Sequence, residues 1–211
     1  MDIHAIRKDY VLNALELRNV NANPLEQFKI WFSEAIESKV NEPNAMVLST
    51  VSSDLRPHSR VVLLKEFREK GFVFFTNYQS NKGREIEGNP HVSLLFFWPE
   101  LERQVRIEGF LKKTTVEDSQ KYFQSRPRGS QIGAHTSPQS QIIPDREWME
   151  KKYDALDKEY QEKTIPMPEN WGGYCVTPDM MEFWQGRPSR LHDRIIYNFK
   201  YGIWDIKRLA P

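Results

Sequence analysis

The stretch VSLLFFWPELERQVRIEGFL, residues 92–111, decides the fold of this chain. Its two halves, 92–98 and 103–111, are rich in β-branched and aromatic residues, and the Pro-Glu pair after the first half favours a turn, so two antiparallel strands are predicted. Three similar runs precede it: AMVLSTV (45–51), SRVVLLK (59–65) and FVFFTN (72–77). Five short strands, joined mostly by hairpin-length links, predict an antiparallel barrel or sandwich.

Helical patterns flank these strands. Asn23 followed by Pro24 starts a helix, and apolar residues then recur at helical spacing as far as Ile36. Further helices are expected within 81–90, from Thr114 or Thr115 to about Ser125, and from about 145 to 163. Strand character returns in WGGYCVTP, where the two glycines predict a turn before Cys175, and in MEFWQG, LHDRIIY and GIWDIKRL.

The composition argues against several classes of protein. Thirty Lys and Arg against 29 Asp and Glu give a formal net charge of +1, too small for binding nucleic acid or an anionic membrane through bulk charge. The single cysteine forms no intrachain disulfide. The N-terminal MDIHAIRKDY lacks an apolar signal core, and the longest apolar run is too short to span a membrane. We therefore expect one cytoplasmic domain, residues 1–211, with neither nucleic acid nor membrane as a partner.

The common cofactor and catalytic motifs are absent from the sequence. The glycines form neither GxGxxG nor GxxxxGK[ST], and there is no GxSxG nucleophile elbow. The five histidines are scattered and form no HExxH, so no metal site is predicted.

Basic residues instead recur at the ends of predicted strands and helices. Arg60 and Lys65 bracket VVLL and would face opposite sides of a regular strand unless a bulge intervenes, and Lys82 opens a helix. Within YFQSRPRGSQIG a phenol, a guanidinium and a hydroxyl are spaced four apart, at Tyr122, Arg126 and Ser130. These groups suit a phosphate, although a solvated helix end is an alternative.

The pentapeptide RLHDR, residues 190–194, places Arg190, His192 and Arg194 on alternating positions. If the segment is extended, the three side chains share one face, and that face attracts anions. A solvated edge strand kept soluble by its charges is the alternative explanation.

Together these stretches resemble the pyridoxine (pyridoxamine) 5′-phosphate oxidases, flavin enzymes that make pyridoxal 5′-phosphate. The matching strings follow the family's order from about Arg7 to Pro211: RVVLLK, FFTN, NPHVSLLFFW, ERQVRIEG, YFQSRPRGSQIGA, PQSQIIPDREW, WGGY, EFWQG, RLHDR and RLAP. The resemblance implies a mainly β fold with flanking helices, a split Greek-key β-barrel of the FMN-binding type. It also implies a homodimer with FMN at the subunit interface.

The resemblance further implies which residues contact FMN: Arg60, Val61, Val62, Leu63, Leu64, Lys65, Phe75, Thr76, Lys82, Gln104, Gln139, Ser140, Trp184 and Arg194. One departure concerns the flavin phosphate, where Asn81 stands in place of the family's usual arginine. The missing contact is expected to cost roughly 1.5–3 kcal/mol of FMN affinity unless Arg84 substitutes.

By the same resemblance, the substrate phosphate is held by Lys65, Tyr122, Arg126 and Ser130, and the ring by Arg190, Leu191 and His192. Arg7 and Tyr10 belong to an N-terminal segment, residues 1–22, that closes over the substrate. The implied reaction oxidises pyridoxine 5′-phosphate and pyridoxamine 5′-phosphate to pyridoxal 5′-phosphate. A hydride passes from C4′ to flavin N5, and O₂ accepts the electrons and gives hydrogen peroxide.

Arg190 and His192 are the catalytic candidates, with His192 either accepting a proton or orienting the substrate. In this interpretation Arg190 and His192 face the substrate, while Arg194 faces the flavin. Two alternatives stay open: a non-catalytic carrier of pyridoxal 5′-phosphate, and a related split-barrel flavin reductase.

Overall fold

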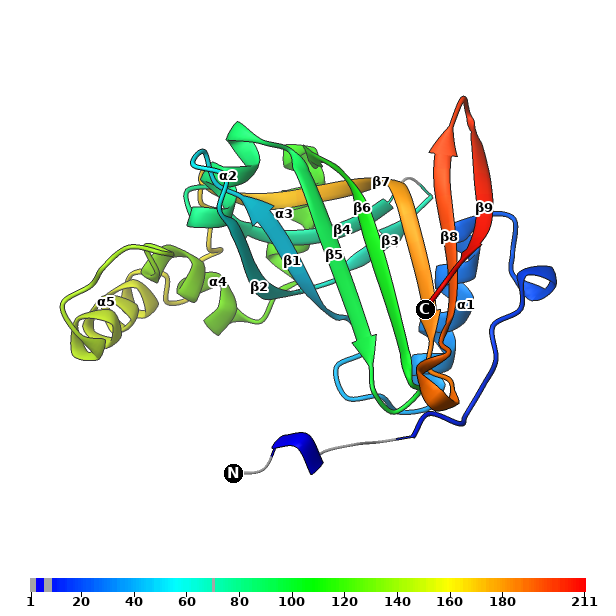
Figure 1. Cartoon of the computed structure of the whole chain (residues 1–211). Coiled ribbons are helices and arrows are strands. Elements are labelled where there is room, and N and C mark those ends of the chain that lie inside the picture. Colours follow the sequence, from blue (N-terminus) through cyan, green and yellow to red (C-terminus); the bar gives the residue numbers. More distant parts are fainter. Residues whose placement is uncertain (1–2, 6–8, 70) are drawn as a thin grey trace.

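The computed structural model describes residues 3–5, 9–69 and 71–211, and its described strands form one curled antiparallel sheet (Figure 1). Neighbouring strands follow the order β2-β1-β5-β6-β7-β4-β3, and β8 and β9 extend from β7 as a hairpin. The strands are β1 Ala45–Val51, β2 Pro57–Leu63, β3 Glu66–Arg68, β4 Gly71–Asn77, β5 His91–Trp98, β6 Arg103–Lys113, β7 Trp171–Gln185, β8 Asp193–Lys200 and β9 Ile203–Leu209.

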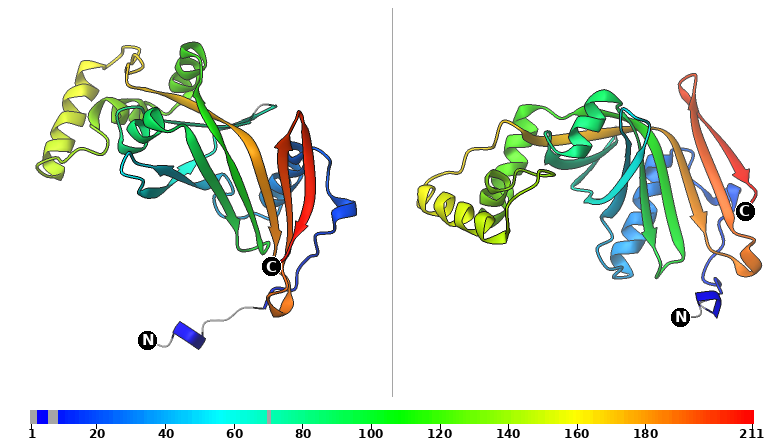
Figure 2. Two further views of the ribbon diagram at one scale, coloured as in Figure 1. Left: turned by 45° about the horizontal axis from the view of Figure 1, so that its top comes forward. Right: turned by 60° about the vertical axis from the view of Figure 1, so that its left-hand side comes forward.

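Helices lie beside the sheet and at one end of it. They are α1 Pro24–Glu37, α2 Asn81–Gly88, α3 Val116–Ser125, α4 Arg128–Thr136 and α5 Arg146–Glu159, with short 3₁₀ turns η1 Ile3–Ala5, η2 Leu17–Asn19 and η3 Pro188–Arg190. In both orientations of Figure 2, α5 projects from the end of the molecule opposite the β8–β9 hairpin. None of the described helices is both long enough and apolar enough to cross a membrane.

The main core lies between α1 and the sheet. The Asn23 side chain caps α1 by accepting a hydrogen bond from Leu25 N at 2.9 Å, which starts the helix where the sequence predicts. Phe28 is fully buried and contacts Phe72 and Phe96 at ring-centroid distances of 4.8 and 5.0 Å. Burying one such ring contributes about 1.5–3 kcal/mol, so α1 is anchored chiefly by its aromatic face.

A second, smaller core fixes the helices at the far end. Phe123 of α3, Ile132 of α4 and Trp171 of β7 form it together with Ile165. Thr115 caps α3 through its side chain, and α3 ends at Ser125. This cluster holds the link between α3 and α4 beside strand β4, where the cavity described below opens.

The structure confirms the mainly β class with flanking helices and changes the expected elements in three places. Strand β3 and helix α4 were not predicted, and β7 is one strand where two were expected. Gly172 and Gly173 therefore lie inside a strand and form no turn. A Cβ on Gly172 would lie 2.2 Å from the Tyr78 hydroxyl, and one on Gly173 would lie 2.6 Å from Thr114 Oγ1, so close packing requires both glycines.

The extended conformation considered for residues 190–194 is wrong. Pro188–Arg190 forms a 3₁₀ turn in which Ser189 and Arg190 have φ of 57° and 61°, and strand β8 begins only at Asp193. The turn reverses the chain between the antiparallel strands β7 and β8. Arg190 therefore does not share a strand face with Arg194, which lies opposite Trp184 in β7.

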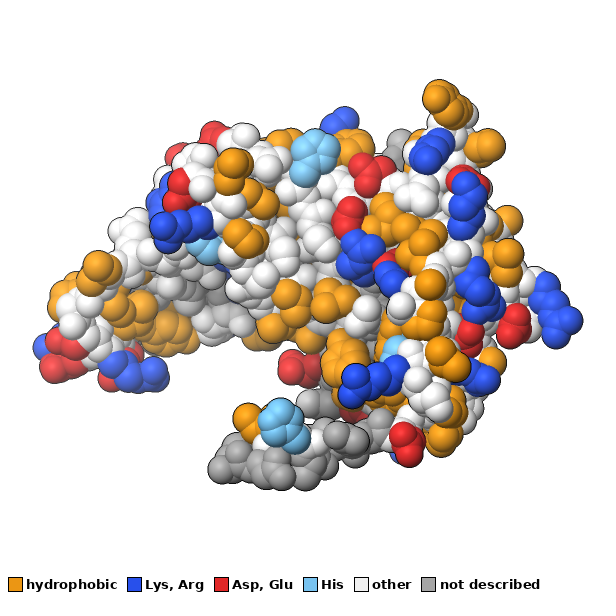
Figure 3. Space-filling model, viewed as in Figure 1, with side chains coloured by type: hydrophobic (Ala, Val, Ile, Leu, Met, Phe, Trp, Pro, Cys, Tyr) orange, Lys and Arg blue, Asp and Glu red, His pale blue; other side chains and the backbone are white. Residues whose placement is uncertain are grey.

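Charges of both signs meet on the C-terminal hairpin. In Figure 3, Lys and Arg side chains over β8 and β9 are interspersed with acidic and hydrophobic ones. Lys207 pairs with Asp205 at 2.7 Å, and Arg208 pairs with Asp193 at 2.6 Å. The basic residues of this hairpin are thus partly neutralised locally.

Candidate active site

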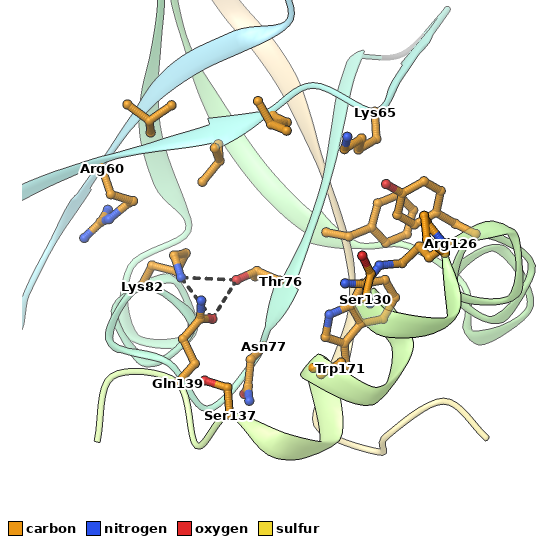
Figure 4. A pocket seen from close by; sticks show the side chains of 18 residues that line it. Arg60, Lys65, Thr76, Asn77, Lys82, Arg126, Ser130, Ser137, Gln139 and Trp171 are labelled. Atoms are coloured by element: carbon orange, nitrogen blue, oxygen red, sulfur yellow. Dashed lines mark hydrogen bonds between the residues drawn. The ribbon is translucent and has the colours of Figure 1, made fainter. Parts of the chain in front are cut away.

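A cavity of about 790 Å³ lies between β2, β4 and α2 on one side and the α3–α4 link on the other (Figure 4). Its wall carries four cationic side chains, and none of the described residues that line it is acidic. The lining residues are Arg60, Val61, Val62, Leu63, Lys65, Phe75, Thr76, Asn77, Lys82, Tyr122, Arg126, Pro127, Ser130, Gly133, Ala134, Ser137, Gln139 and Trp171. Such a cavity attracts anions even though the whole chain is nearly neutral.

Lys82 forms one cationic end of the cavity. The side chain of Ser80 caps α2, which places Lys82 in the first turn of that helix. The residue is only 8% exposed, and its Nζ donates to Thr76 Oγ1 at 3.2 Å and to Gln139 Oε1 at 3.3 Å (Figure 4). It also donates to Ser80 Oγ at 3.2 Å. Burial, followed by the charge of Arg60, lowers the pKa of Lys82 to about 8. An anion bound here would stabilise the charged amine.

Arg60 extends this end along β2. Its Nη1 donates to Leu48 O at 3.2 Å and to the Thr50 hydroxyl, and its Nη2 lies 3.3 Å from Glu85 Oε2. Glu85 also accepts hydrogen bonds from Thr50 and from His58 Nδ1. Burial alone would raise the pKa of Glu85, but these hydrogen bonds and the charges of His58 and Arg60 lower it. The guanidinium is thereby held at the cavity wall by fixed acceptors.

Arg126 forms the second cationic end. Its Nη1 is buried and has no hydrogen-bond partner among the described residues, while its guanidinium carbon lies 4.7 Å from the centre of the Trp171 ring. Burial lowers the pKa of this guanidinium and raises that of Tyr122. A buried N–H without an acceptor is costly, so this nitrogen indicates a place for an anionic ligand.

Aromatic rings line the cavity at the Arg126 end (Figure 4). Phe75 of β4 stacks on Tyr122 of α3 at 3.9 Å between ring centroids, and Trp171 lies parallel to Phe75 at 5.5 Å. The small core described above fixes Trp171 in this place. The cavity therefore combines aromatic surface with two separate cationic groups, a combination suited to flat phosphorylated molecules.

The structure brings together most of the residues predicted for this region. Arg60 and Lys65 share the cavity because β2 ends at Leu63, so strand alternation does not continue to Lys65. Tyr122, Arg126 and Ser130 also share it, although α3 ends at Ser125 and they do not lie on one helix. Leu64 packs in the main core, and Ser140 is exposed with φ 70°; neither lines the cavity.

The remaining predicted residues form a second group at the ends of β6, β7 and β8. Gln104, Trp184 and Arg194 are successive cross-strand partners. Tyr10 and His192 contact Trp184 at ring-centroid distances of 5.7 and 4.6 Å. The exposed Arg190 and Leu191 belong to the adjacent turn and loop, and Arg7 lies outside the described residues. Within one chain, none of the described members of this group lines the cavity.

Two members of the second group have defined partners. His192 Nδ1 accepts a hydrogen bond from Arg187 N at 3.1 Å, and burial together with the charge of Arg190 lowers the pKa of His192. The neutral imidazole therefore carries its proton on Nε2. Arg194 Nε donates to Glu182 Oε1 at 2.7 Å, and the same buried carboxylate accepts from Arg106 at 2.8 Å.

Sequence reasoning missed several residues of the cavity wall. Trp171, Asn77 and Ser137 line it beside the predicted residues. Trp171 opens the WGGY stretch and Ser137 lies two residues before Gln139, so their nearness to quoted motifs was the available signal. Glu85 was also missed, because its contact with Arg60 depends on how α2 packs against β1 and β2.

Comparison with known proteins identifies similar chains over nearly the whole length. Residues 32–158 match a family described as "Pyridoxamine 5′-phosphate oxidase", and residues 171–211 match a "Pyridoxine 5′-phosphate oxidase C-terminal dimerisation region". A pyridoxine/pyridoxamine 5′-phosphate oxidase from Acaryochloris marina is 51% identical over 209 residues, covering 99% of this chain and 95% of the relative.

Two solved structures have similar folds. PhzG from Burkholderia lata 383, crystallised with tetrahydrophenazine-1-carboxylic acid, superposes with a TM-score of 0.90 at 29% identity, covering 95% of this chain and 99% of that one. A pyridoxamine 5′-phosphate oxidase-related, FMN binding protein from Nostoc punctiforme gives a TM-score of 0.69 at 16% identity, covering 87% and 97%. The expected split-barrel class is thereby confirmed.

Proposed function

The chain belongs to the pyridoxamine 5′-phosphate oxidase family of oxidoreductases, and we propose that it oxidises pyridoxine 5′-phosphate and pyridoxamine 5′-phosphate to pyridoxal 5′-phosphate with FMN and O₂. One observation carries the proposal: a single cavity holds two separate cationic ends together with a set of stacked aromatic rings. Two flat phosphorylated molecules, a flavin and a vitamin, fit that arrangement of charge.

The residues around Lys82 fit the phosphate of FMN. Lys82, Thr76 and Gln139 form a buried polar cluster at the first turn of α2, and Arg60 lies on the neighbouring strand. Helix N-termini and cations both favour a bound phosphate. When bound, FMN would accept the hydride from C4′ at N5 and pass the electrons to O₂, which gives hydrogen peroxide.

The residues around Arg126 fit the phosphate of the substrate. Arg126 Nη1 lacks a protein partner, and Tyr122, Ser130 and Lys65 surround the same part of the cavity. A guanidinium and two hydroxyls bind phosphate through charge-assisted hydrogen bonds. Binding this remote group would supply positioning energy for the reacting carbon.

A second subunit would complete the site. The C-terminal 41 residues match a dimerisation region, which supports a homodimer. Gln104, Trp184, Arg190, His192 and Arg194 do not line the cavity of their own chain. We infer that each cavity receives this second group from the partner, so that one active site draws on both subunits.

In this arrangement Arg190 and His192 would face the substrate ring. Because His192 Nδ1 accepts a hydrogen bond from the backbone amide of Arg187, its Nε2 carries the proton and is a donor. A donor at Nε2 favours an orienting role for His192 over acceptance of the substrate proton. Arg194 would face the flavin with its guanidinium fixed by Glu182. Tyr10 would help the N-terminal segment, within residues 1–22, to close over the substrate.

The experiment is oxygen uptake by the FMN-loaded enzyme. We expect uptake with pyridoxine 5′-phosphate and loss of most of it in Arg126→Met at low substrate concentration, while FMN stays bound. No uptake by the FMN-loaded wild type would contradict the proposed function. If the flavin-free protein binds pyridoxal 5′-phosphate tightly and shows no oxidase activity, the non-catalytic carrier would be favoured instead.

A further inference from the structure

A buried carboxylate fastens the N-terminal segment to the body of the protein. Glu102, in the turn between β5 and β6, is only 2% exposed. Its Oε2 accepts backbone hydrogen bonds from Val11 N at 2.8 Å and from Leu12 N at 3.1 Å. Burying a carboxylate is costly unless donors surround it, so these two amides help to compensate a buried charge.

A second acid fastens the same segment a few residues later. Asp193 Oδ2 accepts from Leu15 N at 3.0 Å, and Arg208 bridges Asp193 Oδ1 and Leu15 O at 2.6 and 2.9 Å. Hydrophobic contact adds little near Glu102, because the side chains of Val11 and Leu12 are 66% and 52% exposed. At Val11 and Leu12, hydrogen bonds therefore fix the chain more than apolar burial does, whereas Leu15 is also buried in the main core.

Gly186 leaves the space that the Tyr10 ring occupies, next to the backbone that Glu102 holds. A Cβ on Gly186 would lie 2.6 Å from Tyr10 Cγ and 3.1 Å from the Glu102 Cβ, so a larger residue would displace Tyr10. Gly186 N also donates to Glu102 O at 2.8 Å, which joins the end of β7 to the anchoring turn. In this position, the Tyr10 ring contacts the rings of Trp184 and His192 edge-on, at ring-centroid distances of 5.7 and 5.8 Å.

We propose that Glu102 is a positioning residue that holds Tyr10 against Trp184 and His192, and so determines how tightly the substrate ring is enclosed. The proposal rests on the proposed function, because it takes His192 as part of the substrate site and Trp184 as part of the adjoining flavin site. In this role Glu102 acts on Tyr10 through the backbone of Val11 and Leu12, and neither of these two residues lines the cavity. Gly186, the glycine of EFWQG, contributes to the same positioning because it leaves room for the Tyr10 ring.

The test compares Glu102→Ala, Glu102→Gln and Gly186→Ala in the FMN-loaded enzyme, with Glu100→Gln as the matched control from the same turn. Amide hydrogen exchange at Val11 and Leu12 reports the anchor directly, and KM for pyridoxine 5′-phosphate reports its consequence. For Glu102→Ala we expect exchange and KM each to rise at least about tenfold, because the variant removes the charge-assisted hydrogen bonds to both amides. FMN affinity should stay unchanged.

The other variants separate positioning from a merely structural role. Glu102→Gln keeps an acceptor oxygen and should recover most of the wild-type KM. Gly186→Ala should raise KM in the same direction, since it displaces the same ring. In a Tyr10→Ala background, Glu102→Ala should change KM less than about twofold, because coupled residues are not additive.

Three results would overturn the inference. Unchanged exchange at Val11 and Leu12 in Glu102→Ala would show that the carboxylate is no anchor. Faster exchange with an unchanged KM would reduce Glu102 to a structural role. A wild-type enzyme without turnover would remove the proposed function and the positioning role together, while the exchange result would still stand.

Discussion

At the scale of single residues, the buried amine of Lys82 is the most telling group in the cavity. Its pKa of about 8 in the ligand-free protein results from burial and from the charge of Arg60. A phosphate bound beside it would favour the charged form and raise that pKa. Binding therefore takes up a proton once the pH exceeds the pKa of the free protein.

This linkage predicts the pH dependence of FMN binding. Between about pH 7 and 8, where the FMN phosphate is already largely dianionic, affinity should be level, and above about pH 8 it should fall by up to about tenfold per pH unit. Fluorescence titration of the apoprotein with FMN across this range measures the effect. Lys82→Arg stays charged throughout and should flatten the profile. A wild-type affinity that is constant to about pH 9.5 would mean that Lys82 does not contact the anion.

Asn81 gives a second prediction at this scale. Its Oδ1 accepts from Arg84 Nη2 at 2.7 Å, and Arg84 is exposed and does not line the cavity, so Arg84 does not replace the family's usual arginine in this structure. Asn81→Arg should therefore strengthen FMN binding by about 1.5–3 kcal/mol, or roughly ten- to a hundredfold. Titration calorimetry tests this, with Asn81→Gln as the control; equal affinities for both variants would refute it.

Residue types predicted part of the site well. The phenol, guanidinium and hydroxyl at Tyr122, Arg126 and Ser130 do line one cavity, because their chemistry suits a phosphate whatever the backbone between them does. The four-residue spacing would place them on one face only if the helix continued, and Pro127 instead separates α3 from α4. Residue chemistry was thus a better guide here than residue spacing.

At the scale of elements, the existence of the strands was predicted better than the residues at which they begin and end. Burial alternates along β1 and β5 because one face of each strand is covered, but apolar residues on the other face, such as Val47, Leu95 and Phe97, hide this alternation in the sequence. The length of β7 was missed because Pro178 and the glycines suggest breaks. A register shift opposite Glu108 and Gly109 absorbs the irregularity, and only the partner strand reveals such a shift.

Helix α1 gives a prediction that belongs to this scale. Phe28 is fully buried against the rings of β4 and β5, so Phe28→Ala should lower the free energy of unfolding by about 3–5 kcal/mol. Urea denaturation measures the change. The exposed Ile30 on the same helix provides the control, and Ile30→Ala should cost less than about 1 kcal/mol. Equal losses would show that α1 does not dock through Phe28.

At the scale of the whole molecule, one chain holds two groups of predicted residues that do not meet. The strings that carry the resemblance cover both groups, and sequence alone cannot show which of them share a chain's own cavity. Arg60, Lys82, Tyr122 and Arg126 share one, and Arg190 lies elsewhere. A site made from two subunits reconciles this separation with a common function.

Subunit mixing tests that arrangement. Arg126→Ala and Arg190→Ala homodimers should each be nearly inactive, whereas dimers formed by refolding them together should regain activity. If sites are shared, half of the random dimers are mixed and each has one intact site, so about one quarter of wild-type activity is expected. No recovery, with mixed dimers shown to be present, would place both residues in one subunit's site.

The most direct test of the central claim is the visible spectrum of the FMN-loaded protein during anaerobic addition of pyridoxine 5′-phosphate. We predict that the yellow flavin absorption bleaches in proportion to substrate and returns when O₂ is admitted, with pyridoxal 5′-phosphate formed. A flavin that stays oxidised with the substrate bound would contradict the account, since the cavity would then hold both molecules without passing electrons between them.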